Sequence, residues 1–287
     1  MSVSVVTDST SDLPRELAES LGITVVPLNV HFGTEMYKDG VDITADEFYK
    51  RLVSSAELPK TSQPSIGDFI EVYDWIGAEA EGIVSVHVSA KVSGTYNAAI
   101  QARDQSDAPG TIEVLDTYQA SMGVGMIAIT AARAAREGAD LEEVAEVARR
   151  AIAQSQCFAL FETLEYLQKG GRIGKAQALL GTILKIKPMI IVRDGEVHEL
   201  GKVRTFAKGV ARLKEVAREF APVDSVCVLH STSPDMAGEI ADDLRDLLPA
   251  GQSPFVTRFG PVMGTYVGPG AVGIGLLRAG GSSRTED

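Results

Sequence analysis

The chain has 287 residues, of which 27 are Lys or Arg and 39 are Asp or Glu, so its formal net charge at pH 7 is −12. This length suits one large domain or two smaller ones, and the acidic balance argues against a general binder of nucleic acid or anionic membranes, because bulk repulsion opposes both. The sequence has no apolar run long enough to cross a membrane and no signal peptide at its N-terminus, so we expect a cytoplasmic protein without stable membrane insertion.

The first half of the chain alternates predicted strands with predicted helices. Apolar, β-branched runs predict strands at 2–7, 23–31, 82–88 and 111–115. Helices are predicted after a cap at Ser11 or Asp12, with Pro14 in the first turn, and over 44–54, 65–80, 93–106, 119–136 and 140–152. Thr44-Ala-Asp-Glu47 is a capping box, and Ser65 and Asp140 open further helices. This alternation predicts a parallel sheet with helices on both faces.

The second half predicts a mixed sheet. Strands are expected at 157–161, 188–192, 196–200, 225–229, 254–258 and 271–277, and helices at 172–184, 206–220 and 233–248. Arg193-Asp194-Gly195 is an Asp-Gly hairpin signal, which makes its flanking strands antiparallel. We therefore predict an α/β protein with an N-terminal domain at 1–155, a C-terminal domain at 156–280 and a disordered tail at 281–287.

The cysteines and histidines indicate structural roles. Cys157 and Cys227 sit among apolar residues of predicted strands, so we expect two buried free thiols. The spacings Cys-x-x-Cys and His-x-x-x-His are both absent, so no metal site is expected. The histidines are expected to be structural, since none is placed by sequence beside a nucleophile; they are His31, His87, His198 and His230.

Segments rich in hydroxyl groups or glycine follow predicted strands or open helices, at 7–12, 60–65, 89–96, 169–174 and 260–270. Ligands of open α/β sheets bind beyond the carboxyl ends of strands, so the first segment can hold an anion or only cap a helix. In the second, Ser65 is interpreted as a cap, whereas Thr61 and Ser62 face open turn space and can donate to a carboxylate or phosphate. The last segment has four glycines in eleven residues, which indicates a tightly packed backbone or a structural turn.

Ser93 lies at the start of a predicted helix, where unpaired N–H groups favour anions. It has three open roles: an anion clamp, a plain cap or a nucleophile. The motif Gly-x-Ser-x-Gly does not occur, which counts against the nucleophile. Arg172, at a glycine turn, either reaches an oxyanion or is solvated.

Positive charge is concentrated in residues 169–208, which carry nine basic and three acidic side chains, or +6. The rest of the chain therefore carries −18. This stretch indicates a specific anion or an acidic partner, or else a solvated face. No Gly-x-x-x-x-Gly-Lys-Ser/Thr phosphate loop is present, so the residues alone indicate only an α/β protein whose loops can grip an anionic group.

An ordered set of motifs across nearly the whole chain resembles the DegV family of bacterial lipid-binding proteins. The matching segments are Val5–Pro14, Thr61–Ser65, Ser93–Tyr96, Leu115–Thr117 with Ser121 and Gly123, Gly171–Ile173, Lys202–Thr205 and Gly268–Gly270. The resemblance implies a two-domain fold, with a three-layer α/β/α domain holding a parallel sheet and a two-layer α/β domain holding a mixed sheet.

The resemblance also implies a function. A long-chain fatty acid would lie in an aliphatic tunnel, with its carboxylate held by Thr61 and Ser93, and no cofactor would be needed. The further candidate ligand-binding residues are Ser62, Gly94, Thr95 and Tyr266. The best-understood relatives present the carboxyl group to a separate fatty acid kinase catalytic subunit, which makes an acyl-phosphate for phospholipid metabolism. Arg172 and Arg204 would then contact that partner or the head group.

The chain departs from the family pattern at Tyr266, where many relatives carry a histidine two residues before Gly-Pro-Gly. Tyrosine donates a hydrogen bond but is neutral at pH 7, so carboxylate binding is expected to survive while phosphotransfer can differ. Two other hypotheses remain open. The chain is an enzyme, either a serine hydrolase using Ser93 or a small-molecule kinase related by fold, or it is a ligand-free regulatory module.

Overall fold

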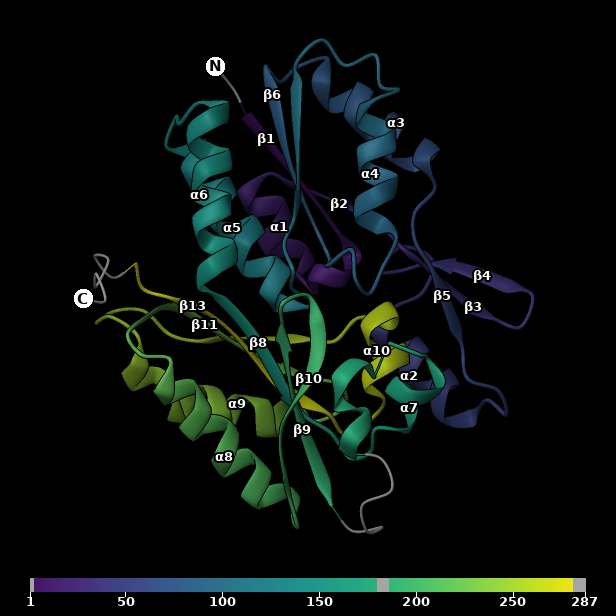
Figure 1. Ribbon diagram of the computed structural model, residues 1–287, viewed down its shortest axis with the longest axis vertical. Coiled ribbons are helices and arrows are strands. Elements are labelled where there is room, and N and C mark those ends of the chain that lie inside the picture. Colours follow the sequence, from purple (N-terminus) through teal and green to yellow (C-terminus); the bar gives the residue numbers. More distant parts are fainter. Residues whose placement is uncertain (1–2, 180–185, 281–287) are drawn as a thin grey trace.

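The computed structural model of the protein describes residues 3–179 and 186–280, which form an upper and a lower body in Figure 1. The upper body is built around a parallel four-stranded sheet in the order β2-β1-β6-β7. Its strands are β1 (Val3–Asp8), β2 (Ile23–Val26), β6 (Gly82–His87) and β7 (Thr111–Asp116). The helices that cover it are α1 (Arg15–Leu21), α3 (Ile66–Gly77), α4 (Thr95–Arg103), α5 (Met122–Arg136) and α6 (Leu141–Gln154).

Neighbouring residues of β1 face opposite layers, as the period of a strand requires. Val6 packs with Phe69 of α3 on one face, whereas Val5 packs with Met126 of α5 and Ala148 of α6 on the other. The predicted three-layer arrangement around a parallel sheet is therefore confirmed.

The lower body is a mixed sheet of six strands in the order β10-β9-β8-β13-β11-β12. Its strands are β8 (Ser155–Leu160), β9 (Lys187–Arg193), β10 (Glu196–Val203), β11 (Val223–His230), β12 (Phe255–Arg258) and β13 (Val272–Arg278). Helices α8 (Phe206–Glu219) and α9 (Pro234–Asp243) cover one face. The predicted two-layer mixed-sheet body is confirmed. Asp194 and Gly195 have φ angles of 50° and 79°, so the expected Asp-Gly turn joins β9 to β10.

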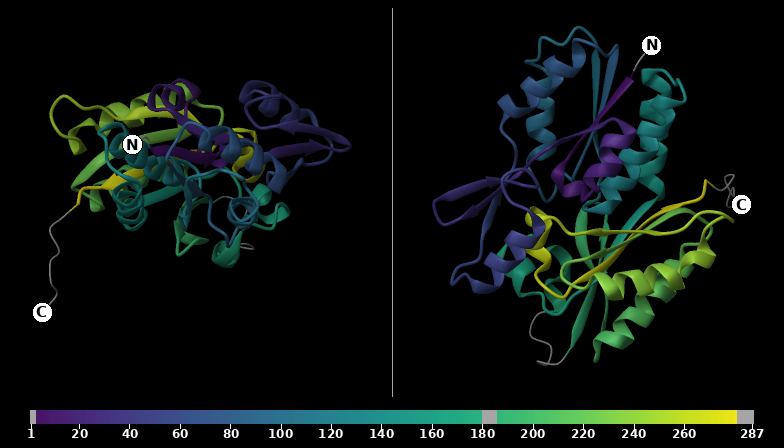
Figure 2. Two further views of the ribbon diagram at one scale, coloured as in Figure 1. Left: turned by 90° about the horizontal axis from the view of Figure 1, so that it is seen from above. Right: turned by 180° about the vertical axis from the view of Figure 1, so that it is seen from behind.

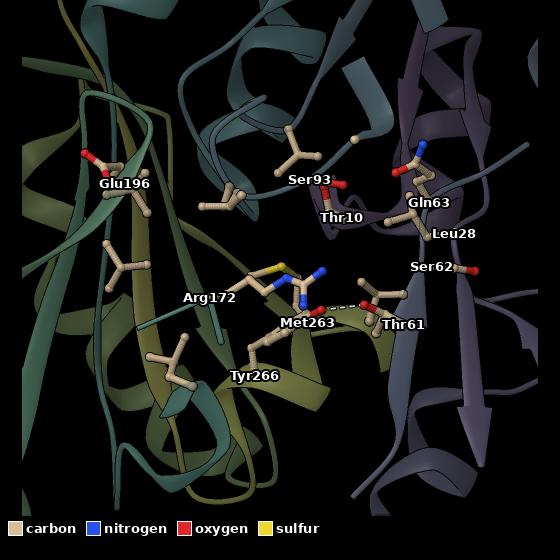
Figure 3. A pocket seen from close by; sticks show the side chains of 18 residues that line it. Thr10, Leu28, Thr61, Ser62, Gln63, Ser93, Arg172, Glu196, Met263 and Tyr266 are labelled. Atoms are coloured by element: carbon tan, nitrogen blue, oxygen red, sulfur yellow. Dashed lines mark hydrogen bonds between the residues drawn. The ribbon is translucent and has the colours of Figure 1, made fainter. Parts of the chain in front are cut away.

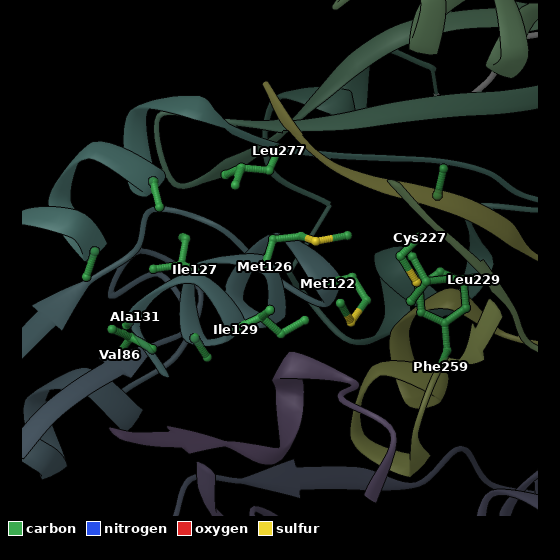
Figure 4. Packing of buried hydrophobic residues seen from close by; sticks show 14 of the residues in the cluster. Val86, Met122, Met126, Ile127, Ile129, Ala131, Cys227, Leu229, Phe259 and Leu277 are labelled. Carbon is green, nitrogen blue, oxygen red and sulfur yellow. The ribbon is translucent and has the colours of Figure 1, made fainter. Parts of the chain in front are cut away.

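The other face of this sheet packs against α5 of the upper body. Met122 lies close to Cys227 and Phe259 in the shared core, as Figure 4 shows. Gly275 of β13 permits this close approach, because a Cβ atom there would lie 2.7 Å from the Met122 Cβ. A single apolar core therefore joins the two bodies.

A third, antiparallel sheet in the order β4-β3-β5 lies at the side of the molecule. Its strands are β3 (Asn29–Phe32), β4 (Glu35–Lys38) and β5 (Lys60–Ser62), and it packs with α2 (Ala45–Ser54) and α10 (Pro261–Val267). Figure 2 shows α2 and α10 beside each other, next to this sheet. The prediction of one strand over 23–31 is wrong, because β2 ends at Val26 and β3 pairs in a different sheet.

Several other expectations need correction. Residues 60–62 form a strand instead of an open turn, and the glycine-rich segment 260–270 contains α10. The described part of the predicted helix 172–184 is a 3-10 turn at Gly174–Leu179, preceded by α7 (Glu165–Lys169); residues 180–185 lie outside the described part. The helix predicted over 233–248 ends at Asp243 and is followed by a 3-10 turn.

The start of α1 also differs from expectation. Its N-cap is Pro14, which has no side-chain cap, and a 3-10 turn at Ser9–Ser11 precedes it. Asp12 has a left-handed φ of 52°, and its carboxylate accepts the Gly260 N–H at 2.8 Å. This side chain therefore serves a distant part of the chain and not the helix that it was expected to cap.

The capping box at Thr44 is confirmed, and Ser65 and Asp140 begin α3 and α6 through capping boxes of their own. Cys157 and Cys227 are buried free thiols, as predicted. Strand β8 begins at Ser155, and the domain boundary near that residue stays a prediction. The tail at 281–287, expected to be disordered, lies outside the described residues.

Candidate functional site

A cavity of about 340 Å³ lies between the two bodies, a size within the range of small-molecule sites. Figure 3 shows it bordered by β5, by the loop after β6 and by α10. Aliphatic and methionine side chains form half of its lining: Leu28, Val88, Val92, Ala120, Leu167, Val192, Val197, Val262 and Met263. Such a wall can bury an alkyl chain, because it offers apolar surface without polar groups that must stay hydrated.

The first polar feature of the cavity is a pair of hydroxyl groups. The Thr61 Oγ1 on β5 lies 2.5 Å from the Tyr266 hydroxyl on α10, and both residues line the cavity. Each hydroxyl carries one proton, so one proton forms the mutual hydrogen bond and the other remains for a ligand. This pair can therefore donate one hydrogen bond to an anion.

A second hydroxyl pair stands at the loop after β6. The Ser93 Oγ lies 2.8 Å from the Thr95 Oγ1 and accepts the Thr95 N–H at 3.3 Å. Ser93 lines the cavity, whereas Thr95 is fully buried and does not. Gly94 is the N-cap of α4, so Ser93 both satisfies an N–H group of the first turn and presents its oxygen to the cavity.

The charged residues among the described lining are Arg172 and Glu196. The Arg172 guanidinium lies 5.3 Å from the centre of the Tyr266 ring, and its Nη1 donates to the Gly170 carbonyl oxygen at 2.9 Å. Lys175, 3.1 Å from Glu196, holds the pKa of that carboxyl below its usual range. Because Lys175 offsets Glu196, the charge of Arg172 is the one available to an anion in the cavity.

The other predicted site residues do not all direct their side chains into the cavity. Ser62 borders it, but its side chain points outward in Figure 3. Its Oγ lies 3.0 Å from the His31 Nε2. Gly94 borders the cavity with Gln63 packed against it, since a Cβ atom at Gly94 would lie 2.0 Å from the Gln63 Oε1. Arg204 is exposed in the turn before α8 and is not among the described lining residues.

A buried polar chain that was not predicted from the sequence lies behind the cavity. Tyr73 donates to the Ser85 Oγ at 2.9 Å, the Ser85 Oγ lies 2.7 Å from the His87 Nε2, and the His87 Nδ1 lies 2.9 Å from the Asp8 Oδ2. A carboxylate only accepts, so the His87 Nδ1–H donates to Asp8. The signal was the spacing of Ser85 and His87, two residues apart on one strand and hence on one face.

This chain of contacts has the residue types of a Ser-His-Asp triad, but its burial agrees with the structural role expected for His87. Ser85, His87 and Asp8 are each fully buried, so no substrate reaches them. Asp8 instead accepts the Thr10 N–H at 3.0 Å and the Thr10 Oγ1–H at 2.5 Å. Because Thr10 lines the cavity, the buried chain fixes part of its wall.

Several lysines of the basic stretch 169–208 form ion pairs. Lys169 pairs with Glu165, Lys175 with Glu196, and Lys187 with Glu162. Within residues 3–179 and 186–280, no group of three or more His, Cys, Asp or Glu side chains is placed to hold a metal ion. Over the same residues, no helix combines the length and the apolar character needed to span a membrane.

Comparison with known proteins identifies the family. A family model described as "Uncharacterised protein, DegV family" matches residues 2–279. The chain belongs to the DegV family. A DegV domain-containing protein of Streptomyces coelicolor is 39% identical over 276 residues, which cover 95% of this chain and 97% of that protein.

Solved structures with the same fold include DegV-family proteins. A fatty-acid-binding DegV family protein from Thermus thermophilus matches with a TM-score of 0.89 and 35% identity, covering 97% of this chain and all of that one. A stearic-acid-binding protein from Eubacterium ventriosum matches with a TM-score of 0.87 and 28% identity, covering 96% of this chain and 98% of that one. The fatty-acid-binding DegV of Bacillus subtilis matches with a TM-score of 0.85 and 29% identity, covering 96% and 99%. The predicted family and its fold are therefore confirmed.

Proposed function

We propose that this chain binds a long-chain fatty acid in the cavity and acts as a non-enzymatic carrier that presents the carboxyl group to a kinase. The observation that carries the proposal is the placement of two hydroxyl pairs on one apolar cavity. The fatty-acid-binding relatives of the same fold support the ligand class. Each methylene buried against the aliphatic wall contributes about 0.8 kcal/mol.

The carboxylate would be held by the protons that the two hydroxyl pairs leave free. Ser93 would donate one hydrogen bond, and the Thr61–Tyr266 pair would donate the other. A carboxylate has two oxygens and accepts from several donors, so one carboxylate has the capacity for both bonds. Arg172 supplies positive charge at the same cavity, and no ion pair ties its guanidinium to an acidic side chain within residues 3–179 and 186–280.

The presentation step concerns Arg172 and Arg204. Arg172 borders the polar end of the cavity, where it can stabilise a phosphate added to the carboxyl group. Arg204 is exposed outside the cavity and is available to a protein partner. We propose that Arg172 serves the head group and that Arg204 contacts the kinase subunit.

A serine hydrolase is less well supported. The hydrogen-bonding side chain beside Ser93 is Thr95, which cannot take up a proton as a general base near neutral pH. The histidine of the buried polar chain lies beside Ser85, out of reach of a substrate. Covalent labelling of Ser93 by a fluorophosphonate probe would revive the hydrolase.

Mass spectrometry of the purified, denatured protein tests the ligand. We expect a long-chain fatty acid to co-purify in amounts that approach one per chain. A protein that carries no such acid, and that does not take one up after delipidation, would contradict the proposal and favour a ligand-free module.

A pull-down with the fatty acid kinase subunit of the same organism tests the partner. Arg204→Ala should lose association, whereas Arg172→Ala should retain association and lose acyl-phosphate formation. Arg245→Ala removes an exposed arginine paired with Asp242 on the lower body and is the matched control. Unchanged association and turnover in both test variants would remove the proposed partner roles.

A further inference from the structure

Helix α10 carries Tyr266 into the cavity, but its first turn is held by the upper body. The Gly260 N–H donates to the Asp12 Oδ1 at 2.8 Å, and the Val262 N–H donates to the Asp39 Oδ2 at 3.4 Å. Gly260 and Val262 are separated from these carboxyl groups by more than 220 residues of chain. The beginning of α10 is therefore placed by two side chains from outside its own body.

Asp12 is built into this contact. It is 6% exposed, its Oδ2 accepts the Ser121 hydroxyl at 2.5 Å, and its carbonyl oxygen accepts the Thr257 hydroxyl at 3.0 Å. Its φ of 52° is costly for a residue with a Cβ atom, although aspartate tolerates it better than most. The surrounding contacts thus hold Asp12 in a strained backbone conformation that directs its carboxylate to Gly260.

Asp39 provides the second acceptor and is 5% exposed. Burial raises its pKa to about 7, while hydrogen bonds from Ser9 and the Val262 N–H oppose the shift. The titratable groups that face it are Asp8, Asp12 and Tyr49, with Arg258 beyond the Tyr49 ring. Carboxyl groups suit this position, because the N–H groups of a first helical turn carry partial positive charge.

The far side of α10 packs against α2. A Cβ atom at Gly264 would lie 2.5 Å from a ring carbon of Phe48, and the Tyr49 hydroxyl donates to the Phe259 carbonyl oxygen at 3.2 Å. The helix thus lies between an apolar surface and the two carboxyl groups. A shift of its first turn would move Tyr266, less than two turns further along, relative to Thr61 on β5.

We propose that Asp12 and Asp39 are positioning residues for fatty-acid binding, because they hold the first turn of α10 and thereby set the distance between the Tyr266 hydroxyl and the ligand carboxylate. The inference rests on the proposed function. Neither carboxyl group lines the fatty-acid cavity or is needed to contact the ligand.

The test introduces Asp12→Ala into two single variants, Thr61→Ala and Tyr266→Phe, for which opposite effects on fatty-acid affinity are expected. In Thr61→Ala the Tyr266 hydroxyl is the remaining donor of its pair, so Asp12→Ala should weaken fatty-acid affinity about ten- to hundredfold further, the loss expected for one hydrogen bond to a charged group. In Tyr266→Phe the remaining donor is Thr61, which stands on β5, so Asp12→Ala should change affinity by less than about twofold. Asp12→Asn keeps an acceptor oxygen for the Gly260 N–H and should restore most of the affinity in the first background.

Asp74→Ala is the matched control, since Asp74 also accepts a serine hydroxyl and a backbone N–H, from Ser106 and Asp107, but on α3 away from the cavity. It should not distinguish the two backgrounds. If Asp12→Ala does not fold, Asp39→Ala carries the same comparison, with circular dichroism as the check on folding. Equal losses in both backgrounds would overturn the positioning role, whereas failure of the otherwise wild-type protein to bind fatty acid would overturn the proposed function instead.

Discussion

The two hydroxyl pairs of the cavity should respond differently to mutation. Ser93 lines the cavity while its partner Thr95 is fully buried, so Ser93→Ala removes the only hydroxyl of that pair that can reach a ligand. A hydrogen bond to a charged group contributes about 1.5–3 kcal/mol, so affinity for a long-chain fatty acid should fall about ten- to hundredfold.

Loss of one hydroxyl from the other pair should affect fatty-acid affinity only weakly. Thr61 and Tyr266 both line the cavity, and loss of one hydroxyl frees the proton of the other. Each single variant, Thr61→Ala or Tyr266→Phe, keeps one donor for the ligand, so affinity should change by no more than about a few-fold. The double variant loses every donor of the pair and should match Ser93→Ala.

Displacement of a fluorescent fatty acid from delipidated protein measures these affinities. Thr95→Val retains the Ser93 hydroxyl and serves as the control, with an expected change of only a few-fold. The reasoning is refuted if Ser93→Ala binds as tightly as the wild type, or if Thr61→Ala alone loses as much affinity as the double variant.

Three further predictions concern buried groups. The pKa of Asp39 is about 7 in the folded protein against an ordinary value of 3.8, so its contribution to the free energy of unfolding is fully present below about pH 4 and declines by about 4 kcal/mol as the pH rises to about 7. Urea unfolding at pH 5 and pH 8 should show about 3 kcal/mol of this decline in the wild type and a smaller decline in Asp39→Asn. Parallel pH profiles of the two proteins would contradict the reasoning. Gly170→Ala places a Cβ atom 2.6 Å from the Tyr266 ring, at a residue whose φ is not left-handed. The substitution should displace the ring and weaken fatty-acid binding several-fold in the same displacement assay. Unchanged affinity would disprove the contact. Gly275→Ala places a Cβ atom 2.7 Å from the Met122 Cβ and should lower the free energy of unfolding, measured in urea, by about 1–3 kcal/mol. Gly238→Ala on α9, where a Cβ atom meets open space, is the control and should not lower it. Equal stability of the two variants would argue against close packing of the bodies.

Much of the fold could be predicted because its signals are local. The capping boxes at Thr44, Ser65 and Asp140 each act within four residues and begin helices where the sequence indicates. The Asp194-Gly195 turn needs positive φ angles that these residue types tolerate, so it marks an antiparallel pair. Strand β5 was missed because three polar residues show no period, and its partner β3 lies about thirty residues away.

The candidate site also combines residues that the sequence indicates with contacts that only the fold creates. Residue type and motif order sufficed to select Thr61, Ser93, Arg172 and Tyr266, and each of them lines one cavity. The pairing of Thr61 with Tyr266 spans 205 residues, and the contact of Asp12 with Gly260 spans 248. Arg204, selected by the same motifs, lies outside the cavity lining, so its role stays a prediction.

The sequence alone determined the parallel sheet and the mixed sheet, most of their helices and the family. These features depend on hydrophobic period, caps, turns and motif order, which are properties of neighbouring residues. Only the tertiary structure decided that the Asp12 carboxylate binds the start of α10 and does not cap the helix that follows Asp12. It also decided that Thr95 is buried while Ser93 lines the cavity, and that His87 belongs to a buried chain of polar side chains. The physical reason is that a polar side chain bonds to whichever group the packed elements bring within reach, and that choice depends on how strands and helices from distant parts of the chain meet.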